Sequence, residues 1–223
     1  MESSARGEYA EAVRHEAKHG DLVLSIEASA LDIGLAGVAV ETDTRLSPQR
    51  KTQLRIREQR GEIVLRGKVV WCFFHGTSAG AGGEHLPVYR AGIEFTDVLT
   101  PVAESLVRFL EGHAVVESGE TRLFGRFRLD EANAVRIEFE APFRLVEAAG
   151  GDASVEAAIG VEPSPGSRAV LELRDGGAPI GAHVADVVRS DSDRERWRLR
   201  LALESPGEGG DEARLAALLE PSS

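Results

Sequence analysis

Hydrophobic and polar residues alternate along much of the chain, a period of two that is typical of β-strands with one buried face. In residues 21–34 the alternation places Leu22, Leu24 and Ile26 on one side and more polar residues on the other. Three later stretches of the first half continue this pattern: 52–58, 61–74 and 89–95. The first half is therefore expected to form several short antiparallel strands.

The period changes to a helical one in two places. In residues 100–111 apolar side chains recur at intervals of three and four, Pro101 suits a first turn and Gly112 suits the end of a helix. A second helical pattern covers residues 211–220, where leucines gather on one face. Each half of the chain is thus predicted to end in a helix.

The second half repeats the order of the first. Residues 37–71 correspond in pattern to residues 158–188, each with a strand, a proline-containing turn, an alternating strand, a glycine-rich turn and another strand. Short strands without intervening helices are typical of small antiparallel barrels. We therefore predict a mainly β protein of two small antiparallel β-barrels, each followed by a C-terminal α-helix. The expected bounds are 1–112 and 121–223, joined by a polar linker at 113–120.

Charge and composition narrow the class of protein. The formal net charge is -11, with 26 Lys+Arg against 37 Asp+Glu, which argues against binding DNA or RNA. Apolar runs stay well short of the roughly 20 residues that span a bilayer, so no membrane insertion is expected. The single cysteine, Cys72, cannot form an internal disulfide, and the N-terminus has no signal-peptide pattern. A cytoplasmic location is expected.

Three stretches resemble the PilZ domain. These are "LDIGLAGVAV" (31–40), "GKVVWCFF" (67–74) and "YRAGIEF" (89–95). The resemblance covers most of 20–112 and extends more loosely to 121–204. It implies a small antiparallel barrel with a C-terminal helix and, in many members, binding of the bacterial second messenger cyclic di-GMP. The family's ligand signature is an RxxxR stretch on the segment entering the barrel and a [D/N]xSxxG turn.

The first half carries only part of this signature. Asp32 and Gly37 match the first and last positions of the turn motif, but Gly34 stands where the family has serine, and no RxxxR precedes it. Asp32 and Gly37 are therefore weaker candidates for ligand contact, and a structural role for Gly37 in a turn or bulge is the alternative.

The second half carries more of it. Arg122 and Arg126 form a full RxxxR, and Asp152 and Ser154 match the turn motif, with Ala157 in place of the final glycine. By resemblance, these four residues are the expected ligand contacts. Guanidinium groups pair with phosphate and with guanine, a carboxylate accepts from guanine N–H groups, and a serine hydroxyl adds an adaptable contact. The alternative for the arginines is an ordinary solvated face.

Other chemistry is not indicated. His15 and His19 have helical chelating spacing but no third ligand, so a surface pair is expected. Cys72 lies in an apolar run without a basic neighbour, and the glycine-rich stretch 76–85 is expected to be a hairpin loop. The sequence thus predicts no enzyme, no metal and no cofactor.

Two functions stay open. The first is a cyclic di-GMP receptor that acts through contacts with an unidentified protein partner. The second is a degenerate PilZ adaptor that binds no nucleotide and works only as a protein-interaction module. For the second, alternation means that if Trp71 and Phe73 point into the core, Phe74 and Cys72 face outward; the alternative is that Phe74 is covered by the C-terminal helix or by the second barrel.

Overall fold

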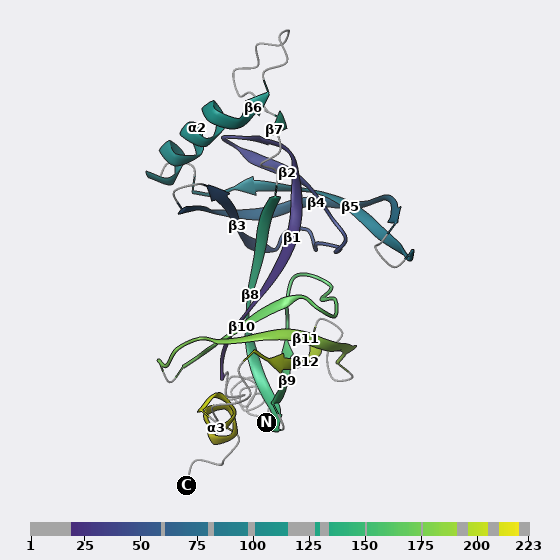
Figure 1. Cartoon of the computed structure of the whole chain (residues 1–223), viewed down its shortest axis with the longest axis vertical. Coiled ribbons are helices and arrows are strands. Elements are labelled where there is room, and N and C mark those ends of the chain that lie inside the picture. Colours follow the sequence, from purple (N-terminus) through teal and green to yellow (C-terminus); the bar gives the residue numbers. More distant parts are fainter. Residues whose placement is uncertain are drawn as a thin grey trace, which may run out of the picture. The chain divides into compact units, whose positions relative to one another are not determined.

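The structure is a computed structural model. It describes residues 19–58, 61–79, 83–97, 101–115, 128–129, 134–149, 151–174, 176–190, 196–204 and 210–218. The strands are β1 Gly20–Gly34, β2 Gly37–Thr42, β3 Lys51–Glu58, β4 Gly61–Ala79, β5 His85–Phe95, β6 Ala114–Val115, β7 Arg128–Leu129, β8 Ala134–Ala149, β9 Asp152–Ala157, β10 Arg168–Leu173, β11 Ile180–Arg189 and β12 Trp197–Leu203. The helices are α2 Pro101–His113 and α3 Gly210–Ala217 (Figure 1). The prediction of a mainly β protein is confirmed.

The chain forms two compact units that are discontinuous in the sequence. Unit 1 comprises Met1–Val23, Glu140–Ile159 and Pro165–Ser223, and unit 2 comprises Leu24–Phe139 and Gly160–Ser164. With the predicted bounds of 1–112 and 121–223, each strand would lie wholly within one of the two units. In the structure, β1 and β8 each contribute residues to both units. The reason is strand length, because β1 has 15 residues and β8 has 16, beyond the usual 3–10.

Unit 2 contains an antiparallel ladder in the order β1–β2–β5–β4–β3–β8. Its alternating strands place one set of side chains in the core, as the sequence pattern predicts; Leu54 and Ile56 of β3 are fully buried. Opposite them in the ladder to β8 lie Ile137 and Val135, which are also buried. The first residues of β8 are therefore part of the core of unit 2.

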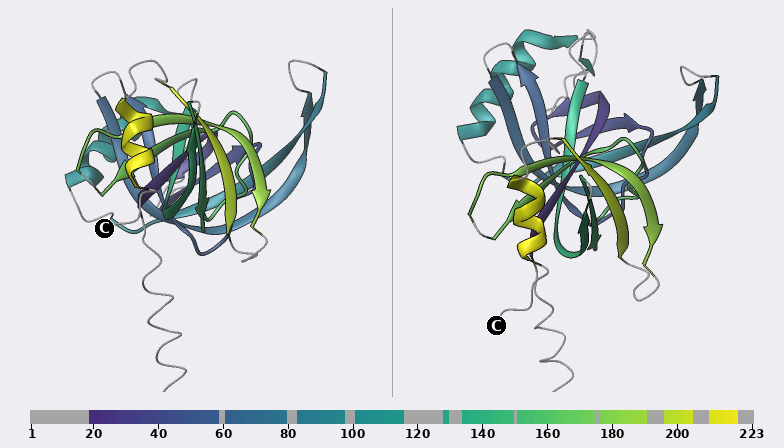
Figure 2. Two further views of the ribbon diagram at one scale, coloured as in Figure 1. Left: turned by 90° about the horizontal axis from the view of Figure 1, so that it is seen from below. Right: turned by 60° about the horizontal axis from the view of Figure 1, so that its bottom comes forward.

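Unit 1 has the corresponding order β8–β9–β12–β11–β10–β1. Here it is the start of β1 that neighbours β10, and the N–H of Arg174 donates to the carbonyl of His19 at 3.3 Å. Alternate residues of β12 and β9 are buried, among them Leu199, Leu201 and Val155. The curved strands of the ladder are visible in Figure 2.

The two ladders share two irregularities. The β1–β2 ladder has a bulge between Ala30 and Asp32, and the β8–β9 ladder has one between Leu145 and Glu147. A second pair of bulges lies at Val69/Trp71 in β4 and Val184/Asp186 in β11. Ala30 and Leu145 are 115 residues apart, and so are Val69 and Val184. Bulges are specific features of a ladder, so this offset defines which residues of the two units are equivalent.

This offset corrects the sequence correspondence. The pattern paired the strand at residue 37 with the strand at residue 158, but the equivalent of β2 (Gly37–Thr42) is β9 (Asp152–Ala157). The error is six residues, an even number. An even shift preserves the inside–outside alternation of a strand, so the hydrophobic pattern alone could not reveal it.

Both predicted helices are present. In α2 the side chains of Leu106, Phe109 and Leu110 are buried, and in α3 Leu215 is buried. Among the residues described, no helix has the length and apolar character needed to cross a membrane.

Candidate ligand-binding site

Two of the four predicted ligand contacts lie side by side in unit 1. Asp152 and Ser154 are two residues apart on β9, so their side chains share the face that points away from the core. Both are half-buried. Arg122 and Arg126 lie outside the described residues. The structure therefore brings together the carboxylate and the hydroxyl, while the arginine pair stays a prediction.

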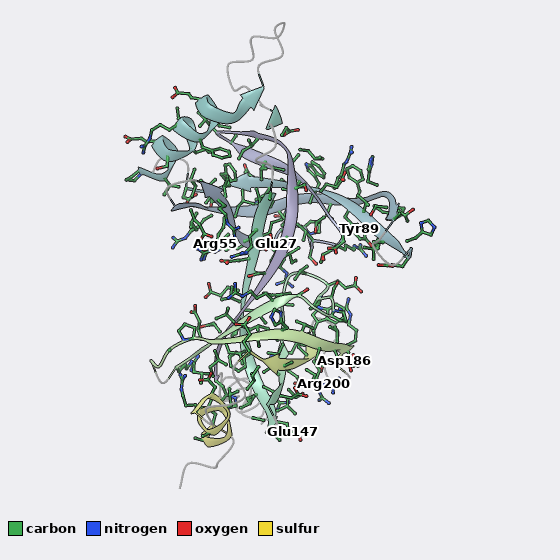
Figure 3. All side chains as sticks on the ribbon, viewed as in Figure 1. Glu27, Arg55, Tyr89, Glu147, Asp186 and Arg200 are labelled. Carbon is green, nitrogen blue, oxygen red and sulfur yellow. The ribbon has the colours of Figure 1, made fainter. Side chains whose placement is uncertain are left out.

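A third polar group joins them from β12. Arg200 lies directly opposite Ser154 in the β9–β12 ladder, and its Nη1 is 4.0 Å from Oδ2 of Asp152. The guanidinium is 58% exposed, which leaves it free to bind a ligand as well. Glu147 and Asp186 complete this row across β8 and β11, and Figure 3 labels both together with Arg200.

The neighbouring row contains a buried carboxylate between two arginines. Glu156 is 2% exposed. Its Oε1 accepts hydrogen bonds from Nε and Nη2 of Arg198 at 3.1 and 2.6 Å, and its Oε2 accepts one from Nη2 of Arg144 at 2.9 Å. The hydrogen bonds from Arg198 are the main reason that the pKa of Glu156 is lowered. Glu156 therefore stays ionised and fixes both guanidinium groups on the outer face.

The exposed arginines make this face suitable for binding an anionic group such as a phosphate. Arg144, Arg198 and Arg200 are 42%, 50% and 58% exposed, so each can still offer N–H groups to a phosphate. Arg198 and Arg200 are two residues apart on one strand, which separates their attachment points by roughly 7 Å. The sequence analysis missed these arginines, although "RWRLRL" places arginine at alternate positions from 196 to 200.

The weaker candidates lie on the β1–β2 hairpin of unit 2. Asp32 is half-buried near the end of β1, and Gly37 is the first residue of β2. A Cβ at position 37 would collide with the backbone carbonyl oxygen of Ile93 on β5. Glycine is therefore needed here for the close approach of two strands, which supports the structural alternative for Gly37.

The turn motif lies at different positions in the two equivalent hairpins, β1–β2 of unit 2 and β8–β9 of unit 1. With the offset of 115 residues set by the bulges, Asp32 corresponds to Glu147 and Gly37 corresponds to Asp152. Asp32 precedes its turn, whereas Asp152 follows the turn and occupies the position of the motif's final glycine. The acidic residue that precedes the turn in unit 1 is Glu147, which lies opposite Ser154.

Unit 2 carries aromatic residues on the face where unit 1 carries charges. The row of Ser154, Arg200 and Asp186 corresponds to Ala39, Gly92 and Trp71. A Cβ at Gly92 would overlap the indole ring of Trp71, so the ring lies flat over this glycine.

The condition that Trp71 and Phe73 point into the core is not met. They are 37% and 51% exposed, and their rings stack with centroids 5.4 Å apart. The bulge between Val69 and Trp71 is the cause, because an extra residue reverses the alternation that follows it. Phe74 is also exposed, at 58%, and its ring meets that of Tyr89 edge-on.

The remaining sequence features have structural explanations. Nδ1 of His19 accepts a hydrogen bond from the N–H of Leu145 at 2.9 Å, and burial is the main cause that lowers the pKa of His19. His15 lies outside the described residues, among which no cluster of metal ligands occurs. Burial raises the pKa of the Cys72 thiol. The expected loop at 76–85 is shorter, since β4 extends to Ala79 and β5 begins at His85.

A second charged site lies in unit 2, where Arg55, Arg57 and Arg136 line a pocket. Nε of Arg136 bonds to Glu27 at 3.1 Å, and Nη1 of Arg55 bonds to Glu62 at 3.3 Å. Figure 3 labels Glu27 and Arg55. Arg55 and Arg136 are thus paired with glutamates, so the pocket is a weaker anion site than the face of unit 1.

Comparison with known proteins gives one match. No curated protein and no solved structure is significantly similar to this chain. Residues 3–112, which contain the β1–β2 hairpin and the aromatic face of unit 2, match the PilZ domain, the module of a family of cyclic di-GMP receptors.

Proposed function

We propose that this chain is a PilZ-type signalling protein that binds cyclic di-GMP on the outer face of unit 1 and acts through protein contacts. The observation that carries the proposal is the cluster of Asp152, Ser154 and Arg200 on one exposed face. PilZ domains are typically ligand-binding or adaptor modules rather than enzymes.

The chemistry of cyclic di-GMP fits these groups. The ligand carries two phosphates and two guanines, and a guanidinium can bind either. In the proposal Arg200 binds a phosphate or the O6/N7 edge of guanine, Asp152 accepts from a guanine N–H, and Ser154 adds a hydrogen bond. Arg122 and Arg126 complete the site from the segment that precedes β8.

Calorimetric titration of the full chain with cyclic di-GMP tests the site. Each charge-assisted contact contributes about 1.5–3 kcal/mol, so Arg122→Ala, Arg200→Ala or Asp152→Asn should weaken binding roughly ten- to hundredfold. The matched control is Arg57→Ala, which removes an exposed arginine from β3 of unit 2. If the wild type binds and none of the three site variants binds more weakly, the ligand lies elsewhere on the protein.

The second candidate function is the adaptor that binds no nucleotide. Its support is the sequence at the equivalent hairpins: Gly34 replaces the motif's serine in unit 2, and Ala149 occupies the same place in unit 1. If the same titration gives no heat at concentrations well above a micromolar dissociation constant, the adaptor function is the one that stands.

We further infer that the two units are copies of one PilZ-like barrel. Support comes from the matching strand order, the two pairs of bulges and their common offset. The family match covers only residues 3–112, so the second copy has diverged further in sequence. An experimental structure in which the strands of either unit form an open sheet would contradict this inference.

A further inference from the structure

The hairpin of β4 and β5 in unit 2 extends beyond its neighbouring strands. β3 accompanies β4 only as far as Lys68, and β2 accompanies β5 only from Tyr89 onward. Within the described chain, residues 73–79 of β4 therefore pair only with β5, and residues 85–88 of β5 pair only with β4. We call these two segments the arm; Figure 2 shows the hairpin as the long curved pair of blue strands.

The two edges of the arm differ in chemistry. On the β5 side Pro87 lacks a backbone N–H, which is how natural sheets commonly block an exposed edge. On the β4 side, residues 69–79 contain no proline, lysine, arginine, aspartate or glutamate. The β4 edge thus lacks the proline and the charged side chains that commonly prevent another strand from pairing, and the bulge between Phe74 and Gly76 is the one such feature found on it within the arm.

Large apolar side chains gather on this segment of β4. Phe73 and Phe74 are 51% and 58% exposed, and as neighbours on a strand they project from opposite faces. Exposed aromatics beside an open strand edge can cover an added strand on both faces, and cross-strand aromatic pairs stabilise such ladders. The equivalent strand of unit 1, β11, has the single apolar residue Val188 in the place of Phe73.

We propose that the β4 edge of the arm pairs antiparallel with the same edge of a second copy of this chain. Each chain carries a net charge of -11, so two copies repel each other least where they meet through an uncharged surface. Residues 73–79 offer such a surface. Antiparallel pairing of one strand with its own copy is two-fold symmetric and consumes both open edges, so association stops at a dimer. This inference does not depend on nucleotide binding.

Sedimentation velocity of the full chain over a micromolar to submillimolar series is the first test. A concentration-dependent monomer–dimer equilibrium is expected, and it should tighten with added salt, because salt screens the repulsion between the two negative chains. A wild-type chain that stays monomeric across the whole series overturns the proposal. This holds even if the β4 edge is then found to bind a different extended peptide.

Charged substitutions locate the surface. Phe73→Lys and Phe74→Lys should each raise the dimer dissociation constant by at least about tenfold, because a lysine at a strand edge must lose its water when a second strand pairs. The matched control is Val188→Lys, which puts the same charge on an exposed residue (56%) at the equivalent position of β11. It should leave the dimer unchanged. If Val188→Lys weakens the dimer as much as Phe73→Lys does, the surface is assigned wrongly.

Hydrogen–deuterium exchange on the wild type gives a readout that requires no variant to fold. Raising the protein concentration should slow the exchange of amides in 73–79 that point to the open edge, and should leave residues 85–88 unchanged. A dimer whose only concentration-dependent protection lies outside residues 69–79 overturns the proposal.

Discussion

Arg198 donates two hydrogen bonds to Glu156 from the strand directly opposite, and the equivalent residues of unit 2, Arg90 and Glu41, form the same cross-strand pair at 3.1 Å. The two pairs differ in their surroundings. Glu156 is 2% exposed, whereas both members of the unit 2 pair are about one third exposed, 36% and 35%. The same cross-strand pair thus occurs in both units, and only in unit 1 is its carboxylate buried.

The difference comes from Arg144. This residue covers the second carboxylate oxygen of Glu156, and its equivalent in unit 2, at the same offset of 115 residues, is Ser29. A serine is too short to reach across to Glu41 in the same way. Arginine in place of serine at this position therefore accompanies the burial of the carboxylate, while both guanidinium groups stay partly exposed.

Glu156→Ala is expected to destabilise the protein more than Glu41→Ala. Loss of the buried carboxylate leaves two arginines without their partner, at a cost of about 1–3 kcal/mol, moderated because both guanidiniums are partly exposed to water. Loss of the exposed pair should cost about 0–1 kcal/mol. Chemical denaturation of the two variants measures the difference. Equal free energies of unfolding would show that burial of Glu156 has no energetic consequence.

The alternating pattern of the sequence was sufficient to find most strands and both helices, because a core side chain every second residue, or every three to four, is imposed by burial itself. Leu54 and Ile56 of β3 and the apolar face of α2 lie in the core as the pattern predicts. The exposure of Trp71 and Phe73 could not be predicted this way, since a bulge has no hydrophobic signature and reverses everything after it.

The candidate site was only partly accessible from sequence. Asp152 and Ser154 could be chosen by motif, but Arg200 becomes part of the site only through the β9–β12 pairing. Likewise, the units are discontinuous because β8 pairs with β3 as well as with β9, and the pairing with β3 joins residues far apart in the sequence. Local patterns carry no information about partners more than 80 residues away, such as Thr52 and Glu138.

Gly37→Ala should destabilise unit 2, which tests whether this glycine is structural. The added methyl group would overlap the carbonyl oxygen of Ile93, and a backbone atom cannot move aside cheaply, so a cost of about 1–3 kcal/mol is expected. Gly76→Ala is the control, because a Cβ at Gly76 meets no atom within 4 Å. Thermal melts of both variants decide the point. A Gly37→Ala protein as stable as wild type would return Gly37 to the list of ligand candidates.

Acidification should weaken folding through His19. Burial, with Arg144 and Arg174 nearby, lowers the pKa of His19 in the folded chain. The unfolded chain, whose histidine has a pKa of about 6.5, therefore takes up this proton first as the pH falls. The stability that neutral His19 provides is complete above about pH 6.5 and is lost as the pH drops below that value toward the folded pKa. Protonated Nδ1 also cannot accept from Leu145.

His19→Gln isolates this effect, since an amide oxygen can accept the same N–H but does not titrate in this range. Unfolding free energies measured from about pH 7.5 to about pH 5.5 should fall less steeply for His19→Gln than for wild type. His85→Gln, at an exposed position on β5, serves as the control and should follow the wild-type slope. Identical slopes for wild type and His19→Gln would remove His19 from the explanation.

A fragment of residues 1–118, which contains the whole PilZ match, is expected not to fold alone. The compact unit around that match includes the start of β8, and Val135, Ile137 and Phe139 are 1%, 0% and 1% exposed there. Fully burying such a side chain contributes about 1.5–3 kcal/mol. Three of them approach the whole stability of a typical domain, about 5–15 kcal/mol. Without them, β3 also loses its ladder partner from Gln53 to Ile56.

Co-expression of residues 1–118 and 119–223 should restore the missing strand and give a soluble complex with a cooperative thermal transition. The same transition should be missing from either fragment by itself, and near-UV circular dichroism should report the loss of fixed packing around the aromatic residues. The full-length variant Ile137→Asp keeps the β8 strand but places a charge in the core of unit 2. It should therefore lose the cooperative thermal transition as well. Cooperative melting of the isolated 1–118 fragment would mean that the PilZ match is a self-sufficient domain and that β8 is dispensable to it.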